Sequence, residues 1–203
     1  MARRSDHTRE QLELLILDSA KEIIRDKGFE SLTARALAKK IGYVPGTIYN
    51  VFHSMDDLIV RINADTLDQL YNTLNDTTCL NPSKTPTDNM KYMARAYMNF
   101  AREKRPFWLM LFSLDLPEQR LENKDYQAKI IRLFDPLETL LKRFAPEMNK
   151  VTLQQASRIL WSSVHGLVSL KETGRMPLIS QSYETEVMCD KLIDIFVSGL
   201  ENQ

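Results

Sequence analysis

IGYVPGTIYNVF, residues 41–52, combines turn-forming and helix-forming residues in a way that restricts the local fold. Gly42 is suited to end one helix, and Pro45 fits the first position of the next, where its missing N–H costs nothing. In a helix, Ile48 and Phe52 lie one turn apart and share a buried face. The stretch therefore predicts two short helices joined by a tight turn, the second ending near Phe52.

The residues on either side extend this pattern to four helices. Apolar residues that recur every three or four positions predict a first amphipathic helix that ends before Gly28. Thr33 is suited to cap the second helix, and Ser54 followed by Asp57 resembles a capping box that opens a fourth helix reaching about residue 74. Two short helices joined by a glycine turn form a helix-turn-helix, the arrangement that enters the DNA major groove.

The remainder of the chain also has helical periodicity, and nothing in its pattern demands a strand. Asp135 and Pro136 suit a cap and a first helical position, so we expect a kink or a restart there. The expected helices, after a polar loop at 75–87, are those at about 88–104, 106–113, 118–144, 150–172 and 183–200. We therefore predict an all-α fold with a helix-turn-helix domain at 1–53 and a larger helical-bundle domain at 54–203, connected by the helix that begins near residue 54.

Composition excludes some classes of protein and leaves others open. The chain has 203 residues, 27 basic and 27 acidic, so its net charge does not indicate a nucleic-acid partner. No apolar run approaches the length of about 18 residues that a membrane span needs. The charged N-terminus has no apolar segment behind it, and Cys79 and Cys189 lack metal or CxxC spacing. These features lead us to expect a cytoplasmic protein with reduced thiols and no contact with a membrane.

The last two helices are apolar over a wider arc than one core contact requires. Apolar residues of the helix at 183–200 cover roughly 200° when each residue turns by about 100°, and the helix at 150–172 is similar. One interpretation is a central helix pair inside a monomer. The other, which we favour, is that both helices also pack on a second copy and form a two-fold four-helix interface.

The outward side chains of the helix-turn-helix suit DNA recognition. An exposed Asn50 could read adenine with two hydrogen bonds, the Thr47 methyl could meet a thymine methyl, and the Tyr43 hydroxyl could reach a phosphate. Residues 31–55 contain three basic residues and no acid. A solvated polar face would have the same composition, so these residues alone leave both interpretations open.

TARALAKKIGYVPGTIYNVFHSMDDL, residues 33–58, resembles the DNA-binding signature of the TetR family of bacterial transcription repressors. The shared features are a Thr start, a buried Leu-Ala pair, a glycine turn and the pattern G-T-(I/L)-Y-x-x-F. LWSSVHGLVSL, residues 160–170, is similar to a W-x-x-x-H-G segment in the ligand-binding domain of one subgroup. The resemblance covers the whole chain and implies a regulator that binds a palindromic operator as a homodimer.

The resemblance also implies roles for individual residues. The start of the second helix would touch phosphate, the turn and the third helix would lie at the bases, and Tyr49 and His53 would contact the backbone. Val44 replaces a frequent serine and Met55 a frequent phosphate-binding lysine, so backbone amides or a basic arm with Arg3 and Arg4 would have to compensate. The DNA-binding residues that we predict are Thr33, Arg35, Lys40, Tyr43, Val44, Pro45, Gly46, Thr47, Tyr49, Asn50 and His53.

In proteins of this family the larger domain holds a small effector that alters DNA binding. Methionine and aromatic residues at helical spacing are more often core than cavity, but their composition here indicates an apolar ligand. His165 is interpreted as a hydrogen-bonded residue at the core edge, a polar group at the pocket or dimer seam, or a chemical group. The predicted ligand-binding residues are Met93, Tyr97, Phe100, Trp108, Phe112, Phe134, Trp161 and His165.

Other classes of function have less support in the sequence. The three histidines fall in three different elements, and no HExxH, phosphate-loop or paired metal-ligand spacing is present, so we expect neither an enzyme nor a metal or cofactor site. A TetR-like factor that binds DNA without a small effector and acts through protein contacts stays an alternative. A packed larger domain without a cavity would favour it.

Overall fold

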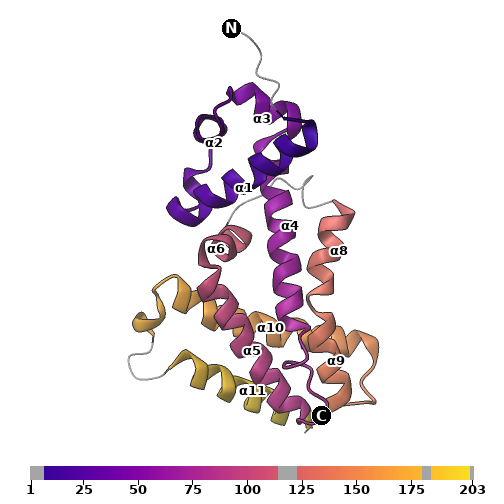
Figure 1. Ribbon diagram of the computed structural model, residues 1–203. Helices are drawn as coiled ribbons and strands as arrows, with labels where there is room; N and C mark the ends of the chain where they lie inside the picture. Colours follow the sequence, from indigo (N-terminus) through magenta and orange to yellow (C-terminus); the bar gives the residue numbers. More distant parts are fainter. Residues whose placement is uncertain (1–6, 114–122, 180–183, 202–203) are drawn as a thin grey trace. The chain divides into compact units, whose positions relative to one another are not determined.

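The computed structural model describes residues 7–113, 123–179 and 184–201, and every regular element in these ranges is a helix (Figure 1). The predicted all-α fold is confirmed. The chain divides into two compact units, one formed by Met1–Thr66 and Pro106–Gln127 and the other by Leu67–Arg105 and Ala128–Gln203. The domain boundary near residue 53 stays a prediction.

The first unit contains the predicted helix-turn-helix. Its elements are α1 (Arg9–Lys27), the 3-10 turn η1 (Phe29–Ser31), α2 (Ala34–Ile41), α3 (Pro45–Val51), the first part of α4 (Met55–Leu74), most of α6 (Arg105–Ser113) and the start of α8 (Lys124–Arg132). The Thr8 side chain accepts a hydrogen bond from the Gln11 N–H, and the Gln11 side-chain oxygen accepts one from the Thr8 N–H, which fixes the start of α1. α1 ends at Gly28, whose φ of 80° favours glycine.

Local signals determine the two short helices. The Thr33 hydroxyl accepts a hydrogen bond from the Ala36 N–H at 3.1 Å, and α2 ends at Gly42, which is left-handed with φ 76° and ψ 26°. Pro45 opens α3, and the Ser54 hydroxyl accepts from the Asp57 N–H at 3.1 Å where α4 begins. The predicted caps and ends of these helices are confirmed.

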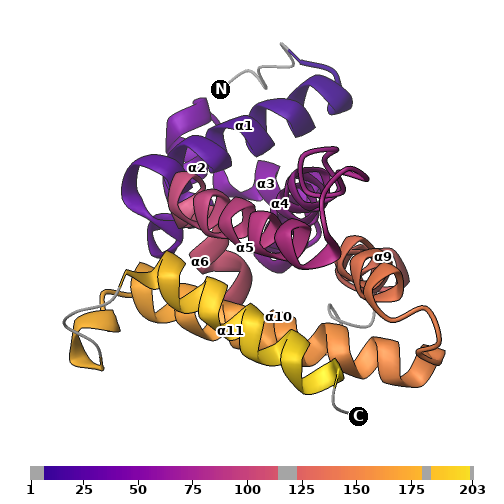
Figure 2. The same cartoon turned by 90° about the horizontal axis from the view of Figure 1, so that it is seen from below.

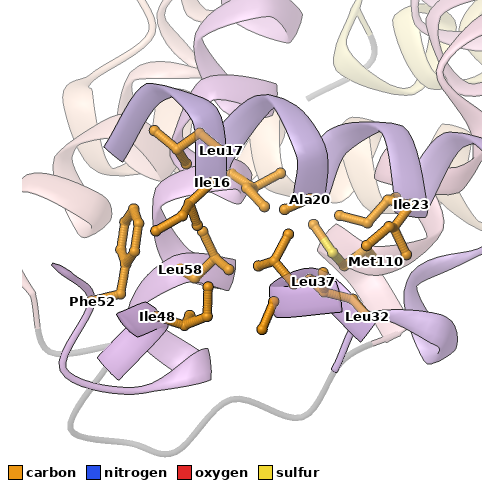
Figure 3. Close-up of a cluster of buried hydrophobic side chains, with 13 residues drawn as sticks. Ile16, Leu17, Ala20, Ile23, Leu32, Leu37, Ile48, Phe52, Leu58 and Met110 are labelled. Atoms are coloured by element: carbon orange, nitrogen blue, oxygen red, sulfur yellow. The ribbon is translucent and has the colours of Figure 1, made fainter. Parts of the chain in front are cut away.

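One hydrophobic core holds the first unit together (Figure 3). Ile16 of α1, Leu37 of α2, Ile48 of α3 and Leu58 of α4 are each fully buried, and Met110 of α6 joins them. Burying one such side chain contributes about 1.5–3 kcal/mol relative to leaving it exposed. The core thus fixes the inner faces of α2 and α3 and leaves their other faces to solvent.

The second unit is a helical bundle. It contains the end of α4, α5 (Pro86–Glu103), the end of α8 (Lys124–Arg132), α9 (Asp135–Phe144), α10 (Lys150–Glu172), the 3-10 turn η2 (Met176–Leu178) and α11 (Thr185–Glu201). α5 packs against α9, α10 and α11, and α10 lies beside α11 along its length (Figure 2). Ion pairs join α5 to α11 through Lys91 and Asp194, 2.5 Å apart, and through Arg95 and Asp190.

The helix expected at about 118–144 differs from the prediction. Its first residues, up to 122, lie outside the described part of the chain, and the rest forms two helices, α8 and α9, with a break at residues 133–134. The predicted restart at Asp135-Pro136 is confirmed, but Asp135 is not the cap. Phe134 occupies the cap position without a side-chain hydrogen bond, because α9 already begins at Asp135 and Pro136 fits within its first turn.

Candidate DNA-binding surface and effector cavity

The outer face of the turn and α3 presents most of the predicted DNA-binding side chains to solvent. Val44 is 68% exposed and Tyr49 47% exposed, whereas Ile48 between them in the sequence is fully buried. Tyr43 and Thr47 are half-buried. The exposed members of the predicted set are Thr33, Arg35, Lys40, Val44, Pro45, Gly46, Tyr49, Asn50 and His53.

Two residues of the predicted DNA-binding set, Tyr43 and Lys40, have polar partners that the sequence did not predict. The Tyr43 hydroxyl oxygen lies 2.8 Å from Nδ1 of His7, the residue that precedes the cap of α1. Lys40 Nζ lies 2.8 Å from Oε2 of Glu22 on α1, and this cation lowers the pKa of the Glu22 carboxyl through a hydrogen bond and its charge. Any DNA phosphate that binds Lys40 would compete with Glu22. Arg3 and Arg4, the predicted basic arm, lie outside the described residues.

The second unit contains a cavity of about 40 Å³. It lies among α5, α9 and α10, with two residues from the break between α8 and α9 and one each from the end of α4 and from α11. None of the described residues that line it is charged. The lining consists of Leu74, Met90, Met93, Ala94, Tyr97, Leu133, Phe134, Leu137, Leu160, Trp161, Val164 and Ile193.

The structure brings together part of the predicted ligand-binding set. Met93, Tyr97, Phe134 and Trp161 line the cavity, and Phe134 meets Trp161 edge to face with ring centroids 5.7 Å apart. Phe100 is buried but does not line the cavity. Trp108 and Phe112 belong to the first unit, where their rings contact each other at 5.1 Å.

His165 lies directly behind this lining. Its ring stacks on Trp161 with centroids 4.9 Å apart, and its Nδ1 is 2.7 Å from the Tyr97 hydroxyl oxygen. Burial lowers the pKa of His165, because desolvation disfavours the charged imidazole. The residue is therefore neutral near pH 7 and hydrogen-bonded to a cavity residue.

The aliphatic lining residues were missed as ligand-binding residues because aliphatic side chains give no signal that separates cavity from core. Leu137, Leu160 and Val164 follow ordinary helical periodicity, and a sequence does not show which side of a packed helix faces a void.

An apolar face runs along α10 and α11 on the surface of this single chain. Val151 and Ile159 of α10 are 64% and 58% exposed, and Val187 and Ile195 of α11 are 58% and 60% exposed. Ile159 and Ile195 line one open groove together with Gly199. Apart from the adjacent residues and the nearby backbone of the same helix, no described atom lies within 4 Å of a Cβ built on Gly166 or Gly199. Part of the apolar surface of both helices thus stays exposed in the single chain.

Two further features concern other classes of site. Within the described residues, no group of three or more His, Cys, Asp or Glu side chains could hold a metal ion. The same part of the chain has no helix that combines the length and the apolar character required to cross a membrane.

The fold and the exposed turn define an all-helical, two-unit regulator of the helix-turn-helix class. Residues 16–62 match the family description "Bacterial regulatory proteins, tetR family", and residues 90–196 match "Tetracyclin repressor-like, C-terminal domain". The second match alone covers more than half of the chain. The chain therefore belongs to the TetR family of transcriptional regulators.

Individual relatives agree with this assignment. An uncharacterized HTH-type transcriptional regulator of Mycobacterium tuberculosis is 24% identical over 192 residues, which cover 93% of this chain and 81% of the relative. A Rhodococcus protein of unknown function has a TM-score of 0.74 at 15% identity, with 98% of each chain covered. FadR from Bacillus subtilis, solved with stearoyl-CoA, has a TM-score of 0.67 at 14% identity and covers 92% of this chain and 98% of its own. The family and the Mycobacterium tuberculosis relative are transcriptional regulators, which confirms the expectation that the chain is not an enzyme.

Proposed function

We propose that the protein is a cytoplasmic transcription repressor that binds a palindromic operator as a homodimer and leaves it when a small apolar effector binds. The observation that carries the proposal is the outer face of α3 and its preceding turn. This face combines exposed Val44, Tyr49 and Asn50 with a fully buried Ile48 that ties the helix to the core. The segment at 31–55, which includes this surface, contains three basic side chains and no acidic one.

Sequence preference requires contacts to base edges in addition to phosphate contacts. Asn50 can bond adenine through both of its amide atoms, and Thr47 and Val44 offer methyl groups to thymine. Lys40, Arg35 and the Tyr49 hydroxyl would instead position the protein on the phosphates. The proposed division of roles thus places base contacts on the turn and α3 and phosphate contacts at its margins.

The apolar face of α10 and α11 supports the homodimer. Large apolar side chains that are more than half exposed on both helices, and an open groove between the helices, favour a second copy over solvent. A two-fold axis would pair the same face of each copy and place two α3 helices about 34–36 Å apart, one turn of duplex.

The uncharged cavity of the second unit supports an effector. A ligand that binds more tightly to a state with the wrong half-site spacing lowers DNA affinity by its differential affinity for the two states. The neighbour from Bacillus subtilis was solved with stearoyl-CoA. The present cavity of about 40 Å³ supports a much smaller ligand for this chain. The second candidate, a DNA-binding factor without an effector, would leave this cavity unused.

The experiment that tests the proposal measures DNA binding and its sequence preference together. The purified full-length protein is mixed with duplex from the flanks of its own gene and with shuffled duplex of equal length, over a range of salt concentrations. We expect tighter binding to the flanking duplex at physiological salt and a stoichiometry of two chains per site. Equal affinity for both duplexes at every salt concentration would contradict the proposal.

A further inference from the structure

We propose that the cavity of the second unit selects a small uncharged molecule with an apolar body of at most one ring, and that it rejects ions and long chains. The inference rests on the proposed function in taking this cavity as the effector site. It adds a charge class and an upper size limit to that site. Three observations carry it: the chemistry of the lining, the pairing of the charges around it, and the size of the space.

The lining offers nothing to balance a charge. Its polar side-chain groups, among the residues described, are the Tyr97 hydroxyl and the Trp161 indole N–H, and both are neutral. An ion moved from water into such surroundings without a counter-charge costs several kcal/mol. A carboxylate or an ammonium group would therefore lose more by desolvation than one neutral hydrogen bond returns.

Arg158 is a cation that contacts the cavity wall, and it already has a counter-charge. The Arg158 guanidinium lies over the Phe134 ring, 4.1 Å from its centroid. The same group forms an ion pair with Glu138 and donates to the Ser157 hydroxyl at 2.7 Å. An anionic ligand would have to displace Glu138 to use this arginine, which would leave a half-buried carboxylate with the Ser157 hydroxyl and without its charged partner.

His165 adds a polar position without adding a charge. The hydrogen bond at 2.7 Å between its Nδ1 and the Tyr97 hydroxyl holds that hydroxyl in one place on the wall. Burial lowers the pKa of His165, so the pair is neutral near pH 7. A neutral ligand with one hydroxyl group thus meets a fixed polar position in an otherwise apolar space.

The volume sets the upper limit on size. The cavity of about 40 Å³ is roughly a quarter of an engineered apolar cavity of about 150 Å³ that binds benzene. Met90 and Met93 line the space, and their unbranched side chains have three rotatable bonds each, so they can rearrange around a single ring. Two fused rings or a long acyl chain would require displacement of helices that pack on one another.

Thermal unfolding of the full-length protein with probes of one ring tests the charge selection. The probes are toluene, p-cresol, benzoate and benzylammonium at one concentration, with 1-naphthol as the larger neutral probe. We expect toluene and p-cresol to raise the melting temperature, p-cresol more than toluene, because ligands of the native state stabilise in proportion to affinity. Benzoate, benzylammonium and 1-naphthol should give no shift. Stabilisation by either ion, or by 1-naphthol, equal to that by p-cresol would overturn the proposal.

Variants locate the binding in this cavity. Tyr97→Phe keeps the ring and removes the hydroxyl, so p-cresol should lose its advantage over toluene, an expected change of about tenfold in apparent Kd. Tyr92→Phe, on the same helix but outside the lining, is the matched control and should keep that advantage. Ala94→Leu fills the cavity and should abolish both shifts, and Val164→Ile, a smaller addition, should reduce them. Each shift is measured against the variant's own melting temperature. A p-cresol advantage that survives Tyr97→Phe would contradict the assignment.

Two separate measurements distinguish an error in the cavity inference from an error in the proposed function. Operator binding by the unliganded protein is measured separately, by fluorescence anisotropy on labelled duplex. If the protein prefers its operator but no neutral probe shifts its melting temperature, the cavity inference is wrong and the DNA-binding proposal stands. If p-cresol stabilises the protein but the protein prefers no duplex, the cavity inference stands and the DNA-binding proposal is wrong.

Discussion

The imidazole Nδ1 of His7 lies 2.8 Å from the hydroxyl oxygen of Tyr43, although the two residues are 36 positions apart in the sequence. The capping box of Thr8 fixes the backbone next to His7, and the left-handed Gly42 fixes the backbone next to Tyr43. The hydrogen bond therefore joins two restrained segments. It determines where the Tyr43 hydroxyl is held at the turn before α3.

His7 should consequently affect operator binding through Tyr43. We expect His7→Ala to weaken operator binding by about 0.5–1.5 kcal/mol, the net contribution of one hydrogen bond. His7→Asn, whose amide can reach the position of Nδ1, should restore more affinity than His7→Gln. In a double-mutant cycle measured by anisotropy, His7→Ala should cost nothing further when Tyr43 is already Phe. Losses that simply add would show that the two residues act independently.

Asn50 should carry sequence information. Its side chain is exposed on α3, one turn from buried residues that hold the helix in place. We expect Asn50→Ala to weaken binding to the operator by about 1–3 kcal/mol and to leave binding to shuffled duplex nearly unchanged. Competition titrations with both duplexes measure this difference. Equal losses on the two duplexes would show that Asn50 contacts the DNA backbone and not the edges of the bases.

Lys40 and Glu22 provide a paired test of phosphate contact. Lys40→Ala should reduce the slope of log K against log salt by about one and leave the sequence preference intact. Glu22→Gln removes the carboxylate that lies 2.8 Å from Lys40 Nζ, so affinity at low salt should increase. Lys104→Ala, in the second unit, is the control and should change neither quantity. An unchanged slope in Lys40→Ala would show that Lys40 does not contact a DNA phosphate.

The helix-turn-helix could be predicted from the sequence because its determinants are local. Thr33 satisfies a free N–H at the start of α2, Gly42 accepts a left-handed backbone, and Pro45 needs no N–H partner in the first turn of α3. Each requirement is met by the residue type at that position. For the same reason the ends of these helices agree with the expectation within a residue or two.

The cavity and the partners of the surface residues could not be predicted in this way. Phe100 and Met93 both lie on the buried side of α5, and only the neighbouring helices determine that Met93 faces a void. The contacts of Tyr43 with His7 and of Lys40 with Glu22 join α1 to the helix-turn-helix, and no sequence spacing encodes them. Tertiary packing also decided the break before α9, where Phe134 rather than Asp135 occupies the cap position.

His165 should make the stability of the second unit dependent on pH. Burial lowers the pKa of this histidine in the folded state, so the unfolded chain binds the proton more tightly. Its contribution to stability is therefore present above the ordinary histidine pKa of about 6.5 and is lost as the pH falls below it. Urea unfolding at pH 7.5 and pH 5.5 should show a larger loss for the wild type than for His165→Asn. An equal loss in both proteins would mean that His165 does not titrate on unfolding in this range.

Ile195 should be essential for the proposed homodimer. The side chain is 60% exposed in the single chain and lines the groove between α10 and α11 opposite Ile159. A two-fold interface repeats every contact, so Ile195→Glu would bury one unpaired carboxylate from each copy in an apolar contact. We expect this variant to be a soluble monomer in light scattering and to bind single half-sites only weakly. Ile131→Glu, a matched change at a residue of α8 that is 59% exposed, should leave a dimer. If Ile195→Glu stays dimeric while its helical content is unchanged, the interface uses a different face of the bundle.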